Sequence, residues 1–360
     1  MSELTTTNKF TLPGIIGSRP TEGATRFNEN LASLEFYTGS EWRAVNSYVD
    51  MGNRSRGVCS GGWNPATPAI QTTIDVFSLT SQGNAIDFGN QAPSNQHQAG
   101  SVSNSIRGII AGGGPANDTH MSYYTISSGG DGLDFGDLNA GRRRCGGLAS
   151  STRGLVCGGR DPGAMEEIDV IEIMTVGNAI DFGDLTTTKN GPSTVSSPTH
   201  GIITNGYSEE SIDKVTIASK GDAVDVGTDM FFGGYGTGGA STGTRGVWAG
   251  GYTSPAVSPY SGMSTTSVRG VDIASGGNAT EFGNLIYSQY NTYNCGTGSN
   301  VRGFWMGGAD EPAPAATKAG RHIVMMNLKS GGEAENWGDL TEGRSGCTAF
   351  SDCHGGLGGI

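Results

Sequence analysis

The residue types that commonly catalyse reactions or bind metal ions form no recognisable motif in this chain of 360 residues. The six cysteines include no C-x-x-C spacing, which is the usual mark of a zinc site or a redox pair. No serine stands in a nucleophile motif. The histidines are isolated and lack metal-binding spacing: His97, His120, His200, His322 and His354. The sequence therefore predicts no catalytic centre, no metal site and no cofactor.

A repeat is visible instead, around one turn glycine in each of six segments. An apolar residue stands six positions before this glycine and another four positions before it, with a polar residue between them. This alternation is the period of a β-strand with one buried face, and it excludes a helix. The turn glycines are Gly83, Gly130, Gly177, Gly221, Gly277 and Gly332.

The length of the repeat predicts propeller blades. Each unit contains four strands, here named a to d: strand b ends in a glycine pair, strand c alternates, strand d holds Phe-Gly, and strand a follows it. Four antiparallel strands in about 45 residues make one blade of a propeller. The second glycine of each pair recurs at intervals of 45 to 57 residues, at Gly62, Gly113, Gly159, Gly206, Gly251 and Gly308.

The two ends of the repeat predict how the ring closes. The first unit enters at strand b, near Arg56, whereas the C-terminus supplies a strand a, residues 344–350, with no blade after it. Pairing these ends gives an all-β, six-bladed propeller over residues 51–360 and leaves no open sheet edge. The segment 354–360 resembles the start of another strand b. Seven blades, with part of residues 20–50 in the seventh, is therefore the alternative.

Composition limits the classes of partner. Glycine accounts for 62 residues and proline for only 13, which fits tight turns and close backbone approaches. The formal net charge of −12 opposes binding to nucleic acid or to an anionic membrane surface. We find no signal peptide and no apolar run of 18 residues, so we expect a soluble protein, assembled in the cytoplasm, without membrane insertion.

Residues 1–50 lie outside the repeat. Strand-like pieces at 25–28, 34–37 and 42–45 surround a turn at Thr38 and Gly39. So few apolar residues bury little surface by themselves. We therefore expect this segment to be held by a partner chain or by other copies of itself.

Three columns of the repeat carry chemistry-bearing side chains. Cys145, Cys295 and Cys347 share one column and are interpreted as small buried hydrophobic residues. A carboxylate column runs through strand d from Asp87 to Glu281 and is interpreted as protection of an edge strand. An arginine column begins strand b in five units and is expected to bind local carboxylates or carbonyls: Arg56, Arg107, Arg153, Arg245 and Arg302.

The glycine pair, the strand c aromatic and the strand d Phe or Trp together resemble the kelch propeller family. The form seen here, Arg153-Gly-Leu-Val-Cys-Gly-Gly159 followed by Gly177-Asn178 and Ala179-Ile-Asp-Phe-Gly-Asp-Leu185, is similar to repeats in structural proteins of tailed bacteriophages. The N-terminal segment is similar to attachment segments of phage fibre and adaptor proteins. The resemblance implies a virion protein that docks through this segment, as a homo-oligomer with a trimer favoured, by way of Phe27, Phe36, Tyr37 and Trp42.

Loop lengths predict where binding occurs. The c-to-d turns carry Gly-Asn or Gly-Asp, which favours tight two-residue hairpins, whereas the b-to-c loops vary widely. We expect a non-enzymatic virion protein whose variable loops contact a host glycan, a host protein or neighbouring virion proteins. A lectin-like module and a carbohydrate-active enzyme are the alternatives. The expected binding face comprises Trp63, Arg143, Arg160, Tyr252, Tyr260, Tyr287, Tyr290 and Asp310.

Overall fold

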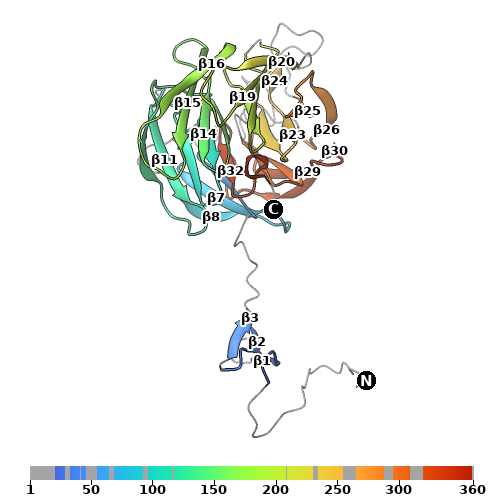
Figure 1. The fold of residues 1–360 in the computed structure, drawn as a ribbon. Coiled ribbons are helices and arrows are strands. Elements are labelled where there is room, and N and C mark those ends of the chain that lie inside the picture. The colour runs from blue at the N-terminus through green and yellow to red at the C-terminus, as the bar shows by residue number, and fades with distance from the viewer. Residues whose placement is uncertain are drawn as a thin grey trace. The chain divides into compact units, whose positions relative to one another are not determined.

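The computed structural model divides into two compact units, Met1–Gly52 and Asn53–Ile360 (Figure 1). We describe each unit by itself. The residues that the structure describes are 21–28, 33–40, 42–45, 55–64, 69–91, 96–115, 117–207, 209–229, 234–253, 265–287, 295–308 and 319–358.

The N-terminal unit contains the three short strands that the sequence predicts. β1 (Thr25–Asn28), β2 (Ser33–Tyr37) and β3 (Trp42–Val45) form an antiparallel sheet with β2 in the centre. Glu35 and Tyr37 are buried on one face of β2. The guanidinium of Arg26 lies 2.7 Å from the Glu35 carboxylate and 4.2 Å from the centroid of the Trp42 ring. These contacts hold the small sheet together from within.

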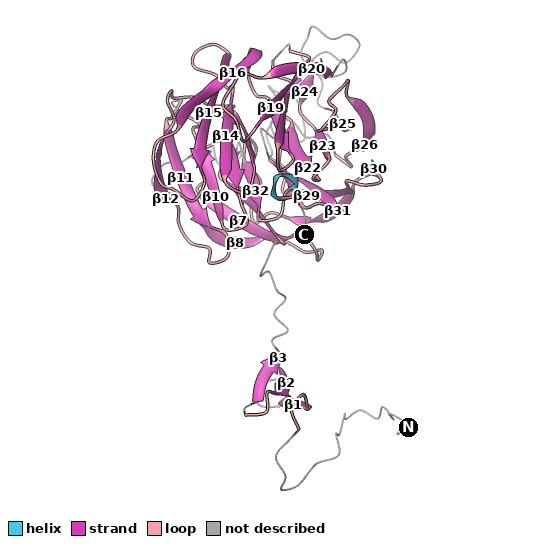
Figure 2. Ribbon diagram, viewed as in Figure 1, coloured by secondary structure: helices cyan, strands magenta, loops and turns pink. Residues whose placement is uncertain are grey.

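The second unit is a six-bladed β-propeller, as predicted (Figures 1 and 2). Blade 1 consists of β32 (Thr348–Ser351), β4 (Arg56–Ser60), β7 (Thr73–Ser78) and β8 (Ile86–Asn90); blade 2 of β9 (Gly100–Ser103), β10 (Arg107–Ala111), β11 (His120–Thr125) and β12 (Leu133–Asp137); and blade 3 of β13 (Gly146–Ala149), β14 (Arg153–Cys157), β15 (Met165–Glu172) and β16 (Ile180–Lys189).

The second half of the chain continues the same order. Blade 4 consists of β17 (Ser193–Ser196), β18 (His200–Thr204), β19 (Ser211–Thr216) and β20 (Val224–Thr228); blade 5 of β22 (Gly238–Ser241), β23 (Arg245–Ala249), β25 (Ser267–Asp272) and β26 (Thr280–Asn284); and blade 6 of β27 (Gly296–Gly298), β28 (Arg302–Met306), β29 (His322–Asn327) and β31 (Glu335–Asp339). Among the described residues, no helix has the length and apolar character needed to cross a membrane.

The ring closes through blade 1. The C-terminal strand β32 pairs with β4, so that Ala349 lies opposite Cys59 and Phe350 opposite Val58. The segment after β32 shows that the alternative of a seventh blade is wrong. Gly355–Leu357 form a 3-10 turn, η1, rather than a strand, because the imidazole of His354 accepts a hydrogen bond from the Gly356 amide and caps the turn.

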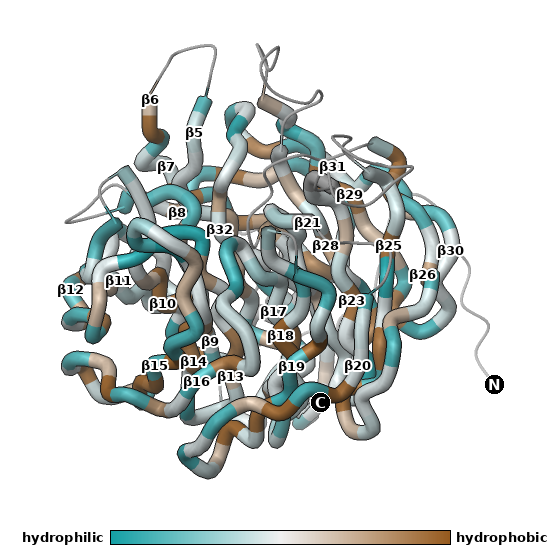
Figure 3. The backbone as a smooth tube through the Cα atoms, turned by 90° about the horizontal axis from the view of Figure 1, so that it is seen from above, coloured by the Kyte–Doolittle hydropathy of each residue, from teal (hydrophilic) through white to brown (hydrophobic). Residues whose placement is uncertain are grey.

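The hydrophobic core lies between the blades. The described part of the propeller contains six clusters of buried apolar side chains, and each cluster joins residues of two neighbouring blades. At the interface of blades 6 and 1, for example, Phe77 meets Phe304 with 5.4 Å between ring centroids. The hydrophobic colouring accordingly follows inner strands such as β10, β14 and β18 (Figure 3). Burial between the blades is the main force holding the ring together.

The c-to-d turns are not the tight two-residue hairpins that the sequence suggested. In blade 3, the pairing of β15 with β16 ends at Val170 and Ile180, and the residues between form a wide arm. This arm reaches the preceding blade, where the Gly177 amide donates to the Phe135 carbonyl at 2.8 Å. A Cβ atom at Gly136 would lie 2.5 Å from the Gly177 carbonyl oxygen. The glycine of Phe-Gly in strand d therefore leaves the space that the arm of the next blade occupies.

The arginine column fastens each blade to the next. Arg56 at the start of β4 donates to the Ile126 carbonyl of blade 2 at 2.6 Å, and Arg302 of blade 6 reaches Leu79 of blade 1 at 3.0 Å. In each case the side-chain donor belongs to one blade and the accepting carbonyl to the next blade around the ring. Blade 4 has His200 in this column, and there Lys214 of β19 replaces the arginine, donating to the Ala274 carbonyl at 3.0 Å. The column therefore binds carbonyls of the next blade, and Arg153 also binds the local Glu172 carboxylate at 2.8 Å, so both expected kinds of partner are found.

Candidate functional site

The loops at one end of the blades form a ring of paired residues around the propeller axis. In each pair, a residue two positions beyond the first glycine of the glycine pair meets a residue just before strand a. Trp63 pairs with Ser345, Gly114 with His97, and Arg160 with Arg143 as isolated bridges. The Tyr207 amide donates to the Asn190 carbonyl at 3.0 Å, and Tyr252 pairs with Tyr235 between β24 (Tyr252–Thr253) and β21 (Gly234–Tyr235). We call these five pairs the mouth ring.

The mouth ring varies from blade to blade, although the backbone beneath it repeats. The side chains at equivalent positions include an indole, imidazole, guanidinium, amide and phenol. Residues that differ on a repeated scaffold are those free to serve recognition, because the blade itself does not require them. Within the described part of the propeller, the mouth ring best fits a binding site.

A hollow of about 390 Å³ opens beside blades 1 to 3 of the mouth ring. Trp63, in the short hairpin of β5 (Trp63–Asn64) and β6 (Ala69–Ile70), is 36% exposed there. Two hydrogen bonds to Ser345, of 2.7 and 2.9 Å, fix the Trp63 backbone. The hollow is lined by Trp63, Ile70, His97, Gln98, Pro115, Arg143, Ser345 and Gly346. An aromatic face beside a guanidinium suits a ligand with an apolar surface and an anionic group.

His97 is a neutral side chain in this hollow. Its burial, together with the positive charges of Arg143 and Arg144, lowers the pKa of the imidazole to about 4. Its Nδ1 atom is buried and has no hydrogen-bond partner within the described structure. At neutral pH, His97 is therefore a neutral imidazole that lines the hollow, and its buried Nδ1 lies near Gly114.

The structure brings some of the predicted face residues together. Trp63 and Arg143 line the same hollow, and Arg160 lies against Arg143, with its Nε donating to the Pro162 carbonyl at 2.8 Å. Tyr252 belongs to the mouth ring through its backbone. Tyr287 lies apart from the hollow and stacks on His322 with 4.4 Å between ring centroids. Tyr260, Tyr290 and Asp310 lie outside the described residues.

The expected attachment residues all fall in the N-terminal unit. Tyr37 is buried against Trp42, with 5.4 Å between their ring centroids, and so serves the packing of the sheet. Phe36 on the opposite face is 38% exposed. Phe27 lies in β1, and its side chain is outside the described part. Among the described aromatic side chains of this unit, Phe36 is the most exposed and so the most available for contact with another protein.

The sequence did not single out His97, Gln98 or Tyr235 as site residues, although a signal for two of them exists. His97 and Tyr235 stand three positions before the first residue of strand a in their blades, at the offset that Arg143 and Ser345 share. Alignment of the d-to-a loops by this offset would have revealed the column. Gln98 is held beside the mouth ring by its backbone, because its carbonyl accepts a hydrogen bond from the Arg144 amide at 2.6 Å.

The propeller axis itself offers little room. The innermost strands leave a cavity of about 60 Å³, lined by residues such as Ser101, Ser196 and Ser351 and closed by His354. His354 is held there by a 2.8 Å hydrogen bond to the Ser103 carbonyl, and its burial lowers the pKa of its imidazole. The space accommodates water rather than an organic ligand.

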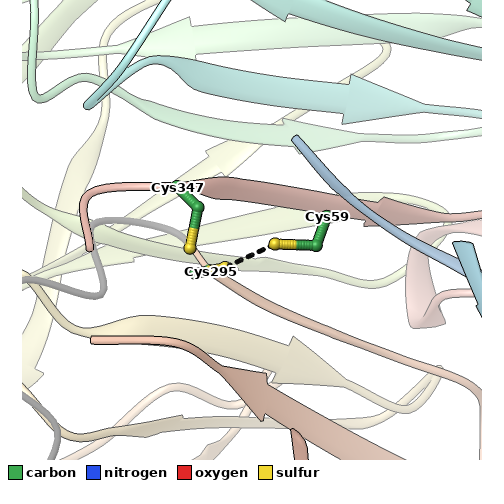
Figure 4. Close-up of side chains that lie close together, drawn as sticks. All are labelled: Cys59, Cys295 and Cys347. Atoms are coloured by element: carbon green, nitrogen blue, oxygen red, sulfur yellow. Dashed lines mark hydrogen bonds between the residues drawn. The ribbon is translucent and has the colours of Figure 1, made fainter. Parts of the chain in front are cut away.

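One cluster of side chains has the composition of a metal site. The sulfur atoms of Cys59, Cys295 and Cys347 all lie within 4.8 Å of one another, and all three residues are buried (Figure 4). Burial by itself raises the pKa of the Cys347 thiol. Hydrogen bonds with the other two thiols and the positive charge of Arg344 nevertheless hold this pKa well below its ordinary range. The cysteines are buried, as the sequence suggested, but three of them converge from distant parts of the chain.

The fold and the mouth ring define the class of the protein as a six-bladed β-propeller with variable loops at one end. No protein-family model matches the chain, and a search of curated proteins finds no match.

Proposed function

We propose that this chain is a non-enzymatic structural protein of a tailed-bacteriophage particle, with a kelch-like propeller that binds a ligand at the mouth ring. The observation that carries the binding part is the hollow of Trp63 and Arg143 on a rigid ring. The virion part rests on the resemblance of the repeats and of the N-terminal segment to phage proteins. The N-terminal unit docks on the particle, and the propeller contacts the host surface or a neighbouring virion protein.

The chemistry of the hollow favours an acidic glycan on the host surface. The indole of Trp63 offers a flat apolar face on which a sugar ring stacks, and the positive charge of Arg143 in the same hollow attracts a carboxylate. The chain as a whole is strongly acidic, with a net charge of −12, so this cationic corner is a local exception. His97 and Gln98 add polar atoms that fix the orientation of hydroxyl groups.

Binding is tested with the full chain on an array of neutral and acidic glycans. Trp63→Ala and Arg143→Ala each reduce binding by about 30-fold, the loss typical of a central interface residue. Lys220→Ala is the matched control, because Lys220 lies on an exposed c-to-d arm, where it pairs with Asp181. We expect this variant to bind normally. Equal binding by all three variants would place the ligand elsewhere.

The virion assignment has a separate test. Mass spectrometry of particles purified from cells that carry this gene finds the chain in a fixed copy number. A propeller that binds glycans but never sediments with particles favours the lectin-like alternative. Turnover of a bound glycan, lost in the Trp63 and Arg143 variants, favours the carbohydrate-active enzyme.

A further inference from the structure

The three clustered cysteines lie where the propeller ring closes. Cys59 is in β4 of blade 1, and Cys347 directly precedes β32, the C-terminal strand of the same blade. Cys295 directly precedes β27 of blade 6. The Sγ atoms of Cys59 and Cys295, which are 236 positions apart, are separated by 3.5 Å. Figure 4 shows the sulfur atoms of the three cysteines close together, with a dashed line between those of Cys59 and Cys295. Three segments that must meet to close the ring thus each contribute one sulfur.

Cys59 interrupts its own column of the repeat. The fourth residue of strand b is large and apolar in every other blade: Ile110, Val156, Ile203, Trp248 and Trp305. These side chains fill the space toward the preceding blade. At the interface of blades 5 and 6, the Trp305 indole spans that space and donates to the Gly238 carbonyl at 2.8 Å. At the interface of blades 6 and 1, thiols occupy the equivalent space. Packing alone does not require sulfur there, because the other five blades use hydrocarbon or indole.

The geometry of the sulfurs fits a three-coordinate metal ion. A metal–sulfur bond of about 2.3 Å in a trigonal plane separates the sulfurs by roughly 4.0 Å. The Sγ atoms of Cys59 and Cys295 are 3.5 Å apart, and all three sulfurs lie within 4.8 Å of one another, so the spacing of the cluster is close to that value. Small rotations of the side chains bring all three to bonding distance.

We propose that Cys59, Cys295 and Cys347 bind one soft, thiophilic d¹⁰ metal ion, Cu⁺ or Zn²⁺, which fastens the first and last strands of the propeller to blade 6. Sulfur is the ligand that selects these ions over hard cations. Cu⁺ is favoured, because structural zinc sites have four ligands and the described cluster has three. Apolar neighbours such as Phe304 and Met306 exclude water from the cluster. The bound ion ties residues 59, 295 and 347 together and opposes opening of the ring.

The test uses the full chain, reduced and freed of metal under anaerobic conditions. Addition of Cu⁺ gives one bound ion per chain by elemental analysis, a sulfur-to-metal charge-transfer absorption, and a higher melting temperature. X-ray absorption then reports three sulfur ligands. Zn²⁺ is titrated in parallel. Stoichiometric binding of Zn²⁺ alone supports the three-thiol site and overturns the preference for Cu⁺.

Variants identify the ligands. Cys59→Ser weakens binding by more than about 100-fold, beyond the usual loss for a second-shell change. Cys59→Val restores an apolar residue of the kind found in the other blades, so this variant folds without binding metal. The matched control is Cys145→Ser with Cys157→Ser, two buried cysteines of blade 3 that belong to no described three-thiol cluster, and it binds normally. The proposal is overturned if the native chain binds neither ion, or if Cys59 and Cys295 are joined in a disulfide that, once reduced, leaves no metal affinity.

Discussion

Arg344 and Asp75 are 269 positions apart in the chain and form a fully buried ion pair, with 3.0 Å between Nη2 and Oδ2. Arg344 also donates to the Thr73 carbonyl at 2.7 Å, and Thr341 donates through its hydroxyl to Asp75 at 2.6 Å. The pair therefore joins the loop before the C-terminal strand β32 to strand c of the first blade. Arg142 and Asp169 repeat the arrangement in blade 3 at 2.7 Å.

Removal of the Arg344 side chain leaves Asp75 as an uncompensated buried charge. We expect Arg344→Ala to lower the free energy of unfolding by about 3 to 5 kcal/mol, measured by denaturant titration. The double variant Arg344→Met, Asp75→Leu removes both charges and recovers part of the loss. Lys220→Ala, at an exposed ion pair, changes stability by less than about 1 kcal/mol. Equal effects of Arg344→Ala and Lys220→Ala would contradict this account.

The blade and the ring closure could be predicted because their signals are local. Period-two alternation in strand c and the glycine pairs repeat in every unit, and counting units from Arg56 to Phe350 gives six. The wide c-to-d arms could not be predicted, because the Gly177 amide finds its partner, Phe135, in another blade. The buried ion pairs were missed for a similar reason: Asp75 looks like a polar interruption of strand c until Arg344 is placed beside it.

The site was predictable only in part. Trp63 and Arg143 were selected for their chemistry and their place in variable loops, and both line the hollow. His97 looked isolated, because only the pairing with Gly114 places it in the mouth ring. The thiol cluster depends on side chains from residues 59, 295 and 347, which meet only after the ring closes. The spacing of residues along the sequence therefore could not predict that these three cysteines lie together.

Lys214 provides a test of the fastening between blades. Its Nζ donates to the Ala274 carbonyl at the place that arginine occupies in the neighbouring blades. We expect Lys214→Ala to reduce the free energy of unfolding by about 1 kcal/mol, the typical value of one hydrogen bond. Addition of His200→Arg restores the guanidinium found in the other blades and recovers the loss. No recovery in the double variant would mean that blade 4 is spaced differently from the rest.

His97 makes the stability of the propeller depend on pH. Its pKa of about 4 in the folded protein lies below the ordinary value of 6.5 for an unfolded histidine. The unfolded chain therefore binds the extra proton first as pH falls, so the stabilisation is complete above pH 6.5 and is lost as pH falls toward 4. The expected loss is up to about 3 kcal/mol, seen in urea titrations at pH 7 and 4.5.

Substitution of His97 separates this effect from general acid denaturation. His97→Gln reduces the difference in stability between pH 7 and 4.5. His200→Asn, a change of a histidine outside the mouth ring, leaves the difference as in the native chain. An unchanged pH dependence in His97→Gln would show that other groups control the acid response.

The two compact units have separate roles in the proposed virion protein. Within the N-terminal unit, Arg26 pairs with Glu35 and Tyr37 packs on Trp42, while the propeller closes its ring with its own C-terminal strand. Each unit is thus stabilised by contacts of its own. We expect a chain of residues 53–360 to melt cooperatively within a few degrees of the full chain and to be absent from purified particles. In the full chain, Phe36→Ala reduces incorporation without changing the melting temperature, because Phe36 is exposed, whereas Tyr37→Ala reduces incorporation by disrupting the small sheet. Normal incorporation of the shortened chain would place the docking surface on the propeller, and failure of residues 53–360 to fold would show that the two units depend on each other.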